Sequence, residues 1–540
     1  MTVSQASYAS GVSSVPLIGR TIGAQLETTA RRFGDSDALV DVASGRRWTY
    51  RELDAAVDRL AAGLLDLGIT RGDRVGIWAP NVPEWVLVQY ATAKIGAILV
   101  NVNPAYRTQE LSYVLNQSGI RTLISAATHR SSDYPAMIEE VRPSAPELRD
   151  VVILGTPGWD RLATGSENPA AVAAALSTLD RDDPINIQYT SGTTGFPKGA
   201  TLSHHNILNN GFFVTEVQRF TERDRLCVQV PFYHCFGMVM GNLGCLAHGS
   251  CVVIPAPSFD AEATMRAIDQ EKCTALYGVP TMYIAILDHP RFADYDFSSL
   301  RTGIMSGSPC PVEVMKRVVD TMHMNEITIS YGMTETSPVS THTPADCSID
   351  RRVSTVGIVH PHVEIKIVHP ETGATVPVGE TGELCARGYL VMRGYWNEPE
   401  KTAEVVDDAG WMHTGDLATM DAEGYVSIVG RLKDLVIRGG ENIYPREIEE
   451  FLYSHPDILD VQVVGVPDER YGEELCAWIR LRDGREPITA ESLRAFCTGK
   501  LAHYKIPRYV HLAEEFPMTV TGKIRKREMR EISAKLLKGG

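Results

Sequence analysis

The chain has 540 residues, of which 44% are hydrophobic and 22% are charged, so it is long enough for several cores and at least two domains. Its formal net charge of -15 argues against a nucleic-acid-binding protein, because a phosphate backbone is bound by a basic surface. Small-molecule partners are therefore expected.

The 10 cysteines include no C-x-x-C pair and no histidine set at metal-ligand spacing, which predicts reduced, mostly buried thiols and a cytoplasmic protein. The N-terminal residues lack the basic and apolar segments of a signal peptide, and the most apolar stretches are interrupted by Lys94, His234 and Gly237. We therefore expect neither a signal peptide nor a membrane span.

The first predicted helix has both a start signal and a stop signal. A capping box from Thr49 to Glu52 begins it, and Gly68 ends it. Its apolar stripe comprises Leu53, Val57, Leu60, Leu64 and Leu67. Such a stripe predicts a helix that packs one face against a core.

Residues 38–126 as a whole alternate strand patterns with helix patterns. Pro83 is placed to begin a helix, and Gly119 is placed to end another. The predicted strands are residues 74–79, 97–102 and 121–125. This alternation is typical of a buried parallel sheet. Residues 143–184 are rich in Pro, Ala, Ser and Asp and are predicted to be a connection with little strand character.

A second alternating series, residues 226–330, predicts another doubly wound sheet. Its strand candidates are residues 226–230, 251–254, 274–277, 301–305 and 326–329. Polar or glycine-bearing segments follow these strands at residues 234–237, 306–309 and 331–335. Ligands of such sheets bind beyond the carboxyl ends of the strands, so the three segments predict one cleft.

The rest of the chain has a different pattern. After Val353 turn residues become frequent, which predicts β-rich structure, and a smaller α/β unit begins near Lys433 with Pro445 opening a helix. The predicted fold class is α/β, with a large N-terminal domain of doubly wound sheets plus a β-rich part, and a small C-terminal α/β domain. The boundary is predicted between residues 1–432 and 433–540.

The segment 189–199, Tyr-Thr-Ser-Gly-Thr-Thr-Gly-Phe-Pro-Lys-Gly, has the composition of a phosphate-binding loop. Its glycines let backbone N–H groups approach an anion, its hydroxyl groups add donors, and Lys198 adds a positive charge. The spacing matches neither a Walker loop nor a Rossmann fingerprint. A flexible linker is the alternative, but linkers rarely carry Phe-Pro-Lys between apolar segments. The sequence therefore predicts an ATP loop in a different nucleotide-binding fold.

Five motifs occur along the chain in a characteristic order: residues 189–199, 331–336 (Tyr-Gly-Met-Thr-Glu-Thr), 414–416 (Thr-Gly-Asp), 430–434 (Gly-Arg-Leu-Lys-Asp) and 517–523 (Pro-Met-Thr-Val-Thr-Gly-Lys). Through these motifs the chain resembles, over nearly its whole length, the adenylate-forming superfamily of acyl-CoA synthetases, adenylation domains and luciferases. Residues 437–445 are most similar to medium-chain fatty acyl-CoA synthetases.

The resemblance implies two half-reactions: a carboxylate attacks the α-phosphate of ATP to give acyl-AMP and pyrophosphate, and a thiol then displaces AMP to give a thioester. Because one anion attacks another, the chemistry needs Mg²⁺ and fixed cations. Lys198 and the hydroxyl groups of Thr190 and Thr334 suit this task, with Glu335 and Thr190 as the expected metal ligands. A surface cap is the alternative for Glu335.

The resemblance also maps the ATP site. Tyr331 offers a flat face for adenine, and Asp416 and Arg431 can bond the ribose. The expected ATP-binding residues are Thr190, Ser191, Gly192, Thr193, Thr194, Gly195, Lys198, Gly307, Ser308, Pro309, Tyr331, Gly332, Met333, Thr334, Asp416, Arg431 and Lys523. Ser330 departs from the family pattern, because many relatives carry glycine or glutamine before the Tyr-Gly pair.

His234 matches the family position beside the substrate carboxylate, where an imidazole shapes the pocket without a fixed charge; a core histidine is the alternative. Residues 235–239 include no acidic side chain that would hold the ammonium group of an amino acid, which favours an apolar acyl chain. The expected acyl pocket comprises His234, Phe236, Gly237, Val279, Ser306, Gly332 and Met333. The expected catalytic residues are Lys523, Glu335, His234 and Thr190.

In the family, the lysine at the position of Lys523 reaches into the cleft and stabilises the carboxylate and the α-phosphate. The basic residues after it are expected on a solvated helix face, where they can help to hold the CoA phosphates. CoA is expected at Gly439, Gly440 and Glu441. Lys433 is the expected hinge of a mobile C-terminal domain. Rotation about it would move Lys523 out of the cleft and bring this glycine segment in. The alternative is that Lys433 is an ordinary surface lysine.

We therefore predict an ATP-dependent fatty acid–CoA ligase that activates a medium-chain carboxylic acid. An enzyme that loads an acyl carrier protein is one alternative, and a ligase for aryl or branched carboxylates is another. A nucleotide-binding module without turnover is a third, but it would have no need for the two lysines Lys198 and Lys523. The absence of a G-x-S-x-G elbow disfavours a serine acyltransferase.

Overall fold

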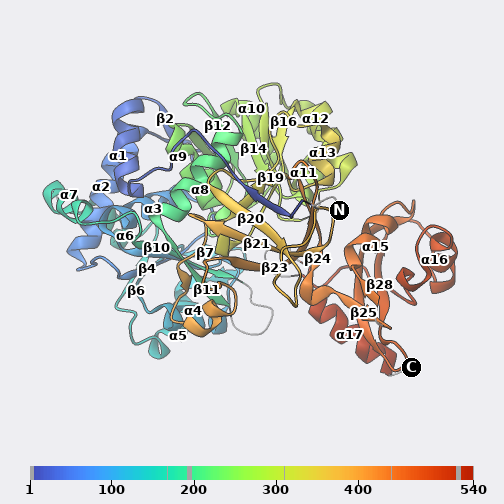
Figure 1. Cartoon of the computed structure of the whole chain (residues 1–540). Helices are drawn as coiled ribbons and strands as arrows, with labels where there is room; N and C mark the ends of the chain where they lie inside the picture. Colours follow the sequence, from blue (N-terminus) through green and yellow to red (C-terminus); the bar gives the residue numbers. More distant parts are fainter. Residues whose placement is uncertain are drawn as a thin grey trace. The chain divides into compact units, whose positions relative to one another are not determined.

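The computed structural model of the chain describes residues 5–166, 168–190, 197–308, 310–439, 441–518 and 524–538 (Figure 1). The chain divides into two compact units. The large unit comprises Tyr8–Ile365 and Cys385–His413, and the small unit comprises Met1–Ser7, Lys366–Leu384 and Thr414–Gly540. The domain boundary expected between residues 432 and 433 stays a prediction.

One seven-stranded sheet of the large unit contains the two strands that flank the predicted ATP loop. Its order is β22 (Gly394–Tyr395), β11 (Lys198–Ser203), β10 (Pro184–Thr190), β5 (Ile98–Asn101), β4 (Arg74–Trp78), β6 (Ile120–Ser125) and β9 (Asp150–Ile153). The strands from β10 to β9 are parallel, whereas β11 is antiparallel to both β10 and β22. The predicted parallel sheet is confirmed.

The helices of this region begin and end at the predicted signals. α2 (Tyr50–Asp66) has the capping box of Thr49 and Glu52, α3 (Pro83–Ile95) begins at its proline, and α4 (Thr108–Ser118) ends at a left-handed Gly119. The prediction that Leu67 belongs to the buried stripe is wrong. Leu67 is the C-cap of α2 and is 36% exposed, because it lies beyond the last turn that packs against the core.

Residues 143–184 have little strand character, as predicted, but the prediction that they are a simple connection is wrong. The segment contains the edge strand β9 and the helices α6 (Pro157–Thr164) and α7 (Pro169–Ser177). Both helices carry proline in the first turn, and α7 is rich in alanine. A composition of Pro, Ala and Ser therefore suits short helices as well as a loop.

The second seven-stranded sheet has the order β16 (Glu326–Thr328), β15 (Thr302–Met305), β14 (Ala275–Gly278), β12 (Arg225–Val228), β13 (Cys251–Ile254), β2 (Asp37–Asp41) and β3 (Arg46–Thr49). It is parallel from β16 to β2, and β3 is antiparallel to β2. All five strands predicted within residues 226–330 are confirmed. The two predicted series are not separate, because β2 of the N-terminal region extends this second sheet.

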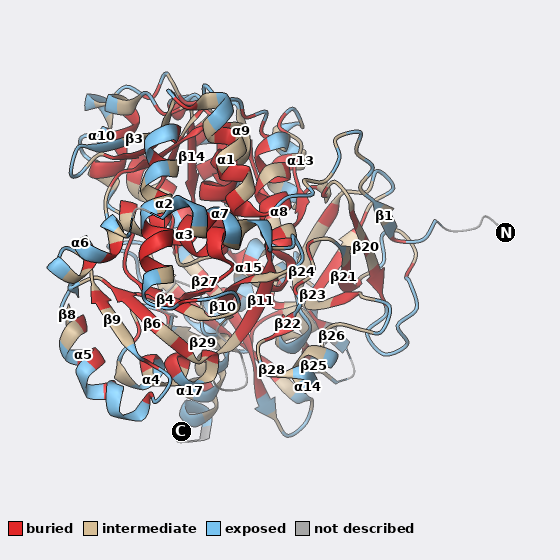
Figure 2. Ribbon diagram, turned by 90° about the vertical axis from the view of Figure 1, so that its left-hand side faces the viewer, coloured by how far each residue is buried: buried red, intermediate tan, exposed pale blue. Residues whose placement is uncertain are grey.

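Helices cover the two sheets, and one hydrophobic core contains residues from both of them. The further helices of the large unit are α1 (Ile22–Phe33), α5 (Tyr134–Val141), α8 (His204–Val217), α9 (Gly244–His248), α10 (Ala261–Glu271), α11 (Pro280–Leu287), α12 (Val312–Met322), α13 (Ile349–Ser354) and α14 (Pro399–Ala403). Except for Glu84, α3 is buried along its whole length (Figure 2). The buried ammonium group of Lys94 pairs with Asp54 at 2.6 Å and with Asp58, which offsets the cost of removing its charge from water.

The β-rich region predicted after Val353 is confirmed. A five-stranded sheet has the order β1 (Tyr8–Ser10), β20 (Val363–Val368), β21 (Gly382–Gly388), β23 (Met412–Met420) and β24 (Val426–Arg431).

A three-stranded sheet has the order β17 (Ser330–Gly332), β18 (Val339–His342) and β19 (Ile358–Val359). β7 (Thr128–His129) and β8 (Ser132–Asp133) form a short antiparallel pair.

The C-terminal part of the small unit is the expected α/β structure. Its sheet contains β26 (Glu441–Ile443), β25 (Val436–Arg438), β28 (Gly472–Leu481), β27 (Ile458–Asp468) and β29 (Tyr509–Leu512). The helices are α15 (Pro445–Leu452), α16 (Ala490–Cys497) and α17 (Lys526–Lys538). Pro445 begins α15 as predicted, and buried residues of α15 and α16 share a core with β27 and β28.

The cysteine prediction is confirmed. All ten cysteines are free thiols, and eight of them are buried. Among the described residues, no helix is both long enough and apolar enough to cross a membrane.

Three buried histidines of the large unit make its stability sensitive to acid. Burial lowers the pKa of His204 and of His342 to about 3 each, and it also lowers the pKa of His360, next to His342. An unfolded histidine has a pKa of about 6.5. The unfolded chain therefore binds more protons than the folded chain below this pH, so stability is full above about pH 6.5 and falls as the pH drops toward 3.

We expect each of these histidines to remove up to about 1.4 kcal/mol from the free energy of unfolding per pH unit below about 6.5. Urea unfolding at pH 7.5, 6.0 and 5.0 measures this slope. In the folded chain the Ile22 N–H donates to His204 Nδ1 at 3.2 Å, and the asparagine of His204→Asn can accept the same bond. Because this variant loses one titrating group, its free energy of unfolding should fall less steeply as the pH drops. His323→Asn, at an exposed left-handed position that asparagine tolerates, is the control. Equal slopes in both variants would contradict the assignment.

Candidate active site

The hairpin of β10 and β11 places two predicted ATP-site residues opposite each other. Thr190 pairs with Lys198 at the loop end of the hairpin, and Thr190 Oγ1 lies 3.5 Å from the Lys198 carbonyl oxygen. The Pro197 carbonyl accepts a hydrogen bond of 3.0 Å from the Tyr113 hydroxyl of α4. The expected ATP-loop residues Ser191, Gly192, Thr193, Thr194 and Gly195 lie outside the described residues.

The predicted acid Glu335 lies near this hairpin. It is in the short 3₁₀ turn η4 (Thr334–Thr336), and only 5% of it is exposed. Its Oε1 accepts a hydrogen bond of 2.8 Å from the hydroxyl of Tyr395 in β22. The Lys198 ammonium group lies 4.8 Å from the centre of the same tyrosine ring. The surface cap considered for Glu335 is therefore wrong, because the carboxylate is buried and bonded.

The segments after β15 and β16 are joined side by side, as the predicted cleft requires. Ser306 Oγ donates to the Ser330 carbonyl at 2.6 Å, and the two serine hydroxyl groups are 3.5 Å apart. Ser330, which departs from the family pattern, is thus buried and part of this link. Gly307 has a φ of +92°, a conformation that favours glycine. Pro309 lies outside the described residues.

The predicted adenine segment is shaped by a close backbone contact. A Cβ atom at Gly332 would lie 1.7 Å from the Pro338 carbonyl oxygen, so only glycine fits there. The Met333 N–H donates to the same carbonyl at 3.0 Å. Tyr331 and Thr334, on either side of these two residues, are half-buried, so this turn can offer side chains to a ligand.

His234 is held by the backbone around it. Its Nδ1 accepts a hydrogen bond of 3.3 Å from the Phe236 N–H, so a neutral ring carries its proton on Nε2. The next residue, Cys235, donates to Gln188 Oε1 at 3.1 Å. Burial raises the pKa of the Cys235 thiol to about 12, and the Glu335 carboxylate raises it as well. His234 is therefore in the same neighbourhood as the predicted metal ligand.

An apolar region follows His234. The π-helix η2 (Phe236–Leu243) is buried throughout, and Phe236 stacks on Tyr277 of β14 with the ring centres 5.6 Å apart. A Cβ atom at Gly237 would lie 2.4 Å from the Pro231 carbonyl oxygen, so this glycine permits a close turn. Val279, just after β14, borders Gly307, because a Cβ atom at Gly307 would lie 3.1 Å from Val279 Cγ1.

In the small unit, the two predicted ribose ligands lie together. Asp416 of β23 is the direct partner of Arg431 in β24, and Arg431 Nε lies 3.1 Å from Asp416 Oδ1. Asp416 is buried, whereas the Arg431 side chain is half exposed. The Asp416 N–H donates to Thr414 Oγ1 at 3.1 Å, so the threonine of the Thr-Gly-Asp motif helps to hold the backbone of its aspartate.

The predicted hinge and CoA residues follow along the chain. Lys433 lies in the 3₁₀ turn η5 (Leu432–Asp434), and its carbonyl accepts a hydrogen bond of 3.0 Å from Arg530. Gly439 has a φ of +60° and donates to the Tyr471 carbonyl at 2.8 Å. Glu441 is exposed, and its backbone lies opposite that of Arg438 in the antiparallel pairing of β25 and β26. Gly440 lies outside the described residues.

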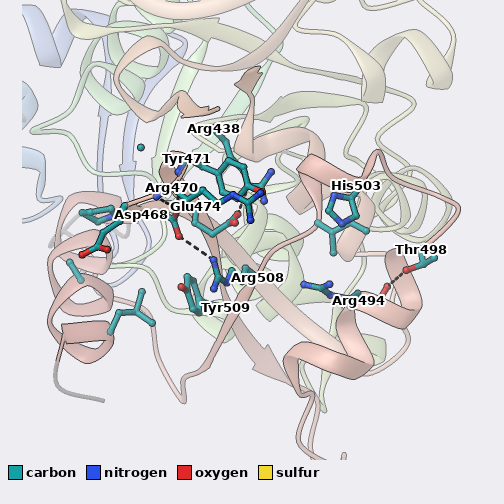
Figure 3. A pocket seen from close by; sticks show the side chains of 16 residues that line it. Arg438, Asp468, Arg470, Tyr471, Glu474, Arg494, Thr498, His503, Arg508 and Tyr509 are labelled. Atoms are coloured by element: carbon teal, nitrogen blue, oxygen red, sulfur yellow. Dashed lines mark hydrogen bonds and ion pairs between the residues drawn. The ribbon is translucent and has the colours of Figure 1, made fainter. Parts of the chain in front are cut away.

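A cavity of about 830 Å³ in the small unit was not predicted (Figure 3). Its basic lining residues are Arg438, Arg470, Arg494, His503 and Arg508. Arg438 is paired with buried Glu474 at 2.7 Å, and Arg508 is paired with Asp468 at 3.1 Å. The arginines suit an anion, although Asp468, Glu469 and Glu474 in the same lining offset part of their positive charge (Figure 3).

The predicted catalytic Lys523 lies outside the described residues. The basic residues after it are only in part a solvated helix face. Arg525 and Arg527 make exposed pairs with glutamates three and four residues further on. Lys526 departs from the prediction, because its ammonium group binds Glu449 Oε1 at 2.6 Å and is mostly covered.

Two features of the site were not found from the sequence. Tyr395 bonds a residue 60 positions earlier in the chain, and no local pattern marks such a contact. The arginines of the cavity come from separate strands, loops and helices of the small unit. The sequence signal for this cavity is weak: it consists of two Arg-Tyr dipeptides, residues 470–471 and 508–509.

Comparisons with known proteins identify the family of the chain. Residues 26–396 match the family described as AMP-binding enzyme, and residues 447–523 match the AMP-binding enzyme C-terminal domain. The chain is 48% identical over 536 residues to the "Putative acyl-CoA synthetase YngI" of Bacillus subtilis (strain 168), covering 95% of this chain and 97% of that protein. It is 47% identical to the mitochondrial medium-chain acyl-CoA ligase ACSF2 of Danio rerio, covering 98% and 91% of the two chains. The crystal structure of ATP-bound MatB from Rhodopseudomonas palustris has a TM-score of 0.82 at 30% identity, covering 96% of this chain and 99% of that chain.

Proposed function

Because the chain belongs to the AMP-binding enzyme family, we propose that it is an ATP-dependent carboxylic acid–CoA ligase that works through acyl-AMP. The substrate carboxylate attacks the α-phosphorus of ATP and releases pyrophosphate; the CoA thiol then attacks the acyl carbon, loses its proton and releases AMP. The observation that carries this proposal is the grouping of Lys198, Glu335 and Tyr395 beside the predicted ATP loop.

Within the large unit, we assign the charged groups to the first half-reaction. Lys198 would bind a phosphate of ATP, because its ammonium group is a point charge at the end of a flexible side chain. Glu335 and Thr190 would hold Mg²⁺, since the cation prefers oxygen ligands and a buried carboxylate gains from a positive partner. Bound Mg²⁺ would neutralise phosphate charge during the transfer.

The nucleoside is proposed to bind through the remaining predicted residues. The half-buried ring of Tyr331 offers a face to adenine, and the backbone of Gly307 and Ser308 can bond the edge of the base. Asp416 accepts hydrogen bonds from the ribose hydroxyl groups in this assignment, with Arg431 beside it as a donor.

For the second half-reaction, we assign the CoA phosphates to the arginine-lined cavity of the small unit. Its arginines favour phosphate, and Arg438 is adjacent in sequence to the predicted CoA residue Gly439. The glycines Gly439 and Gly440, with Glu441, are the proposed contacts of the thiol-bearing arm, because a missing side chain allows a close approach. An acyl carrier protein in place of CoA is the alternative acceptor.

The acyl group is proposed to be an apolar chain of medium length. The buried π-helix after His234, the stacked Phe236 and the half-buried Val279 supply an apolar surface without an acidic side chain. His234 would lie beside the carboxylate, where an imidazole ring can shape the pocket without a fixed charge. A cytoplasmic location is proposed from the free thiols, although the zebrafish relative is named as mitochondrial.

We expect the specificity constant kcat/KM to rise with acid length and then fall. Each added methylene should contribute up to about 0.8 kcal/mol until the end of the pocket is reached. The measurement is pyrophosphate release and acyl-CoA formation with straight-chain acids from acetate to palmitate, with and without CoA. Release that needs no CoA but yields no thioester would indicate a carrier-protein acceptor.

Two valine variants test whether the assigned pocket sets this optimum. Val279→Phe should move the optimum toward shorter acids, because the larger ring would occupy space bordered by Gly307. Val312→Phe, at a position of α12 that is 41% exposed, is the matched control and should leave the profile unchanged. An aromatic or amino acid substrate that exceeds every acid from hexanoate to dodecanoate would contradict the fatty acid assignment.

A further inference from the structure

One side chain, Tyr395, contacts both charged groups assigned to ATP. Its hydroxyl donates to Glu335 Oε1 at 2.8 Å, and the Lys198 ammonium group lies 4.8 Å from its ring centre. Both the tyrosine and the glutamate are buried, with 7% and 5% of each residue exposed. A hydrogen bond to a carboxylate is strengthened in such a place, because little water competes for it.

The backbone around Tyr395 is fixed by several hydrogen bonds. Tyr395 pairs with Ala200 across β22 and β11, so its ring lies next to the strand that carries Lys198. The Tyr395 N–H donates to Thr402 Oγ1 at 2.9 Å. The following N–H, of Trp396, donates to the Gly199 carbonyl at 2.7 Å. These bonds hold the backbone from which the phenol extends.

The turn that carries Glu335 is fixed to the same segment. The Met392 N–H donates to the Glu335 carbonyl at 2.9 Å, and Ser337 Oγ donates to the Leu390 carbonyl at 2.6 Å. The segment 390–396 thus joins η4 to β11, and Tyr395 is its side chain that reaches both. With Oε1 bonded to the phenol, Oε2 would be the oxygen that binds the proposed cation.

We propose that Tyr395 is a positioning residue for adenylation, whose hydroxyl orients the Glu335 carboxylate and whose ring seats the Lys198 ammonium group. The first contact fixes a ligand for the divalent cation, and the second places a positive charge over the electron-rich face of the ring. This inference rests on the proposed function for the identity of the ligand, MgATP.

The two roles can be separated by two substitutions. Tyr395→Phe removes only the hydroxyl, whereas Tyr395→Leu removes the ring as well. The probe is ATP, titrated by calorimetry with excess Mg²⁺ and again in EDTA. We expect Tyr395→Phe to reduce the gain in ATP affinity due to Mg²⁺ by about ten- to a hundredfold and to leave binding in EDTA unchanged.

Tyr395→Leu should also weaken ATP binding in EDTA, by about two- to thirtyfold, because Lys198 loses its aromatic partner. When Lys198 is also replaced by alanine, the variants with leucine and with phenylalanine at position 395 should bind ATP equally in EDTA. Tyr134→Phe is the matched control, since its buried hydroxyl donates to the Pro104 carbonyl at 2.6 Å and contacts neither charged group. It should bind ATP like the unchanged protein under both conditions.

Equal binding by Tyr395→Phe and the unchanged protein in Mg²⁺ would overturn the inference. A loss of the same size in Mg²⁺ and in EDTA would also overturn it, because that result indicates a general change in the fold. Thermal unfolding of each variant supplies the stability for comparison. The binding experiment does not depend on turnover, so failure of the unchanged protein to form acyl-CoA would reject the proposed ligase activity alone.

Discussion

Replacing Lys523 with alanine is expected to abolish acyl-adenylate formation while sparing thioester formation from supplied acyl-AMP. Charge develops at the α-phosphate only in the first half-reaction, and the resemblance assigns this lysine to that charge. Removal of one such group costs roughly 3 kcal/mol, or about a hundredfold to a thousandfold in rate. Pyrophosphate release measures the first step, and CoA consumption with synthetic acyl-AMP measures the second.

A matched control for this variant lies four residues further along. Arg527→Ala removes a nearby positive charge whose partner is Glu531, at 3.0 Å on the exposed surface of α17. Such a pair contributes little to stability, so adenylation should stay close to normal in Arg527→Ala. If Lys523→Ala impaired both half-reactions equally, the assignment of this lysine to adenylation would be wrong.

The parts of the fold that could be predicted are those with local signals. The capping box of Thr49 and Glu52, the glycine at 119 and the proline at 445 each determine a helix end through atoms a few residues away. The strands of the second sheet are short apolar segments between helical patterns, so their positions could be predicted, whereas their order in the sheet and the addition of β2 and β3 were not. The same reasoning failed for residues 143–184, because alanine and proline are compatible with both loops and short helices.

The candidate site could be predicted as a set of residues but not as an arrangement. Sequence order placed Lys198 and Glu335 in one reaction, yet the contact between them passes through Tyr395, which belongs to a two-residue strand. The pairing of Asp416 with Arg431 depends on the register of β23 and β24, including a bulge after Leu417. Long-range register is set by packing of the whole sheet, so single-residue patterns do not reveal it.

The hinge predicted at Lys433 leads to the last expected result. Lys433 lies in the middle of η5, a 3₁₀ turn, and φ in such turns lies between about −50° and −70°. Proline has a φ near −65°, so Lys433→Pro suits the turn seen here. The carbonyl that Arg530 contacts is retained in the variant. The substitution should therefore keep φ at position 433 and restrict its other values, at some cost to Leu432, because a residue before proline disfavours the helical region.

If the C-terminal part rotates about this residue between half-reactions, Lys433→Pro should slow thioester formation far more than adenylation. A residue forced into an unfavourable φ costs on the order of 1–3 kcal/mol, which corresponds to about five- to a hundredfold in rate. Lys433→Ala is the matched control, because it removes the same side chain but leaves φ free to change. Transfer from acyl-AMP to CoA at a normal rate in Lys433→Pro would show that the chain does not pivot there, whereas equal losses in both variants would assign the effect to the side chain.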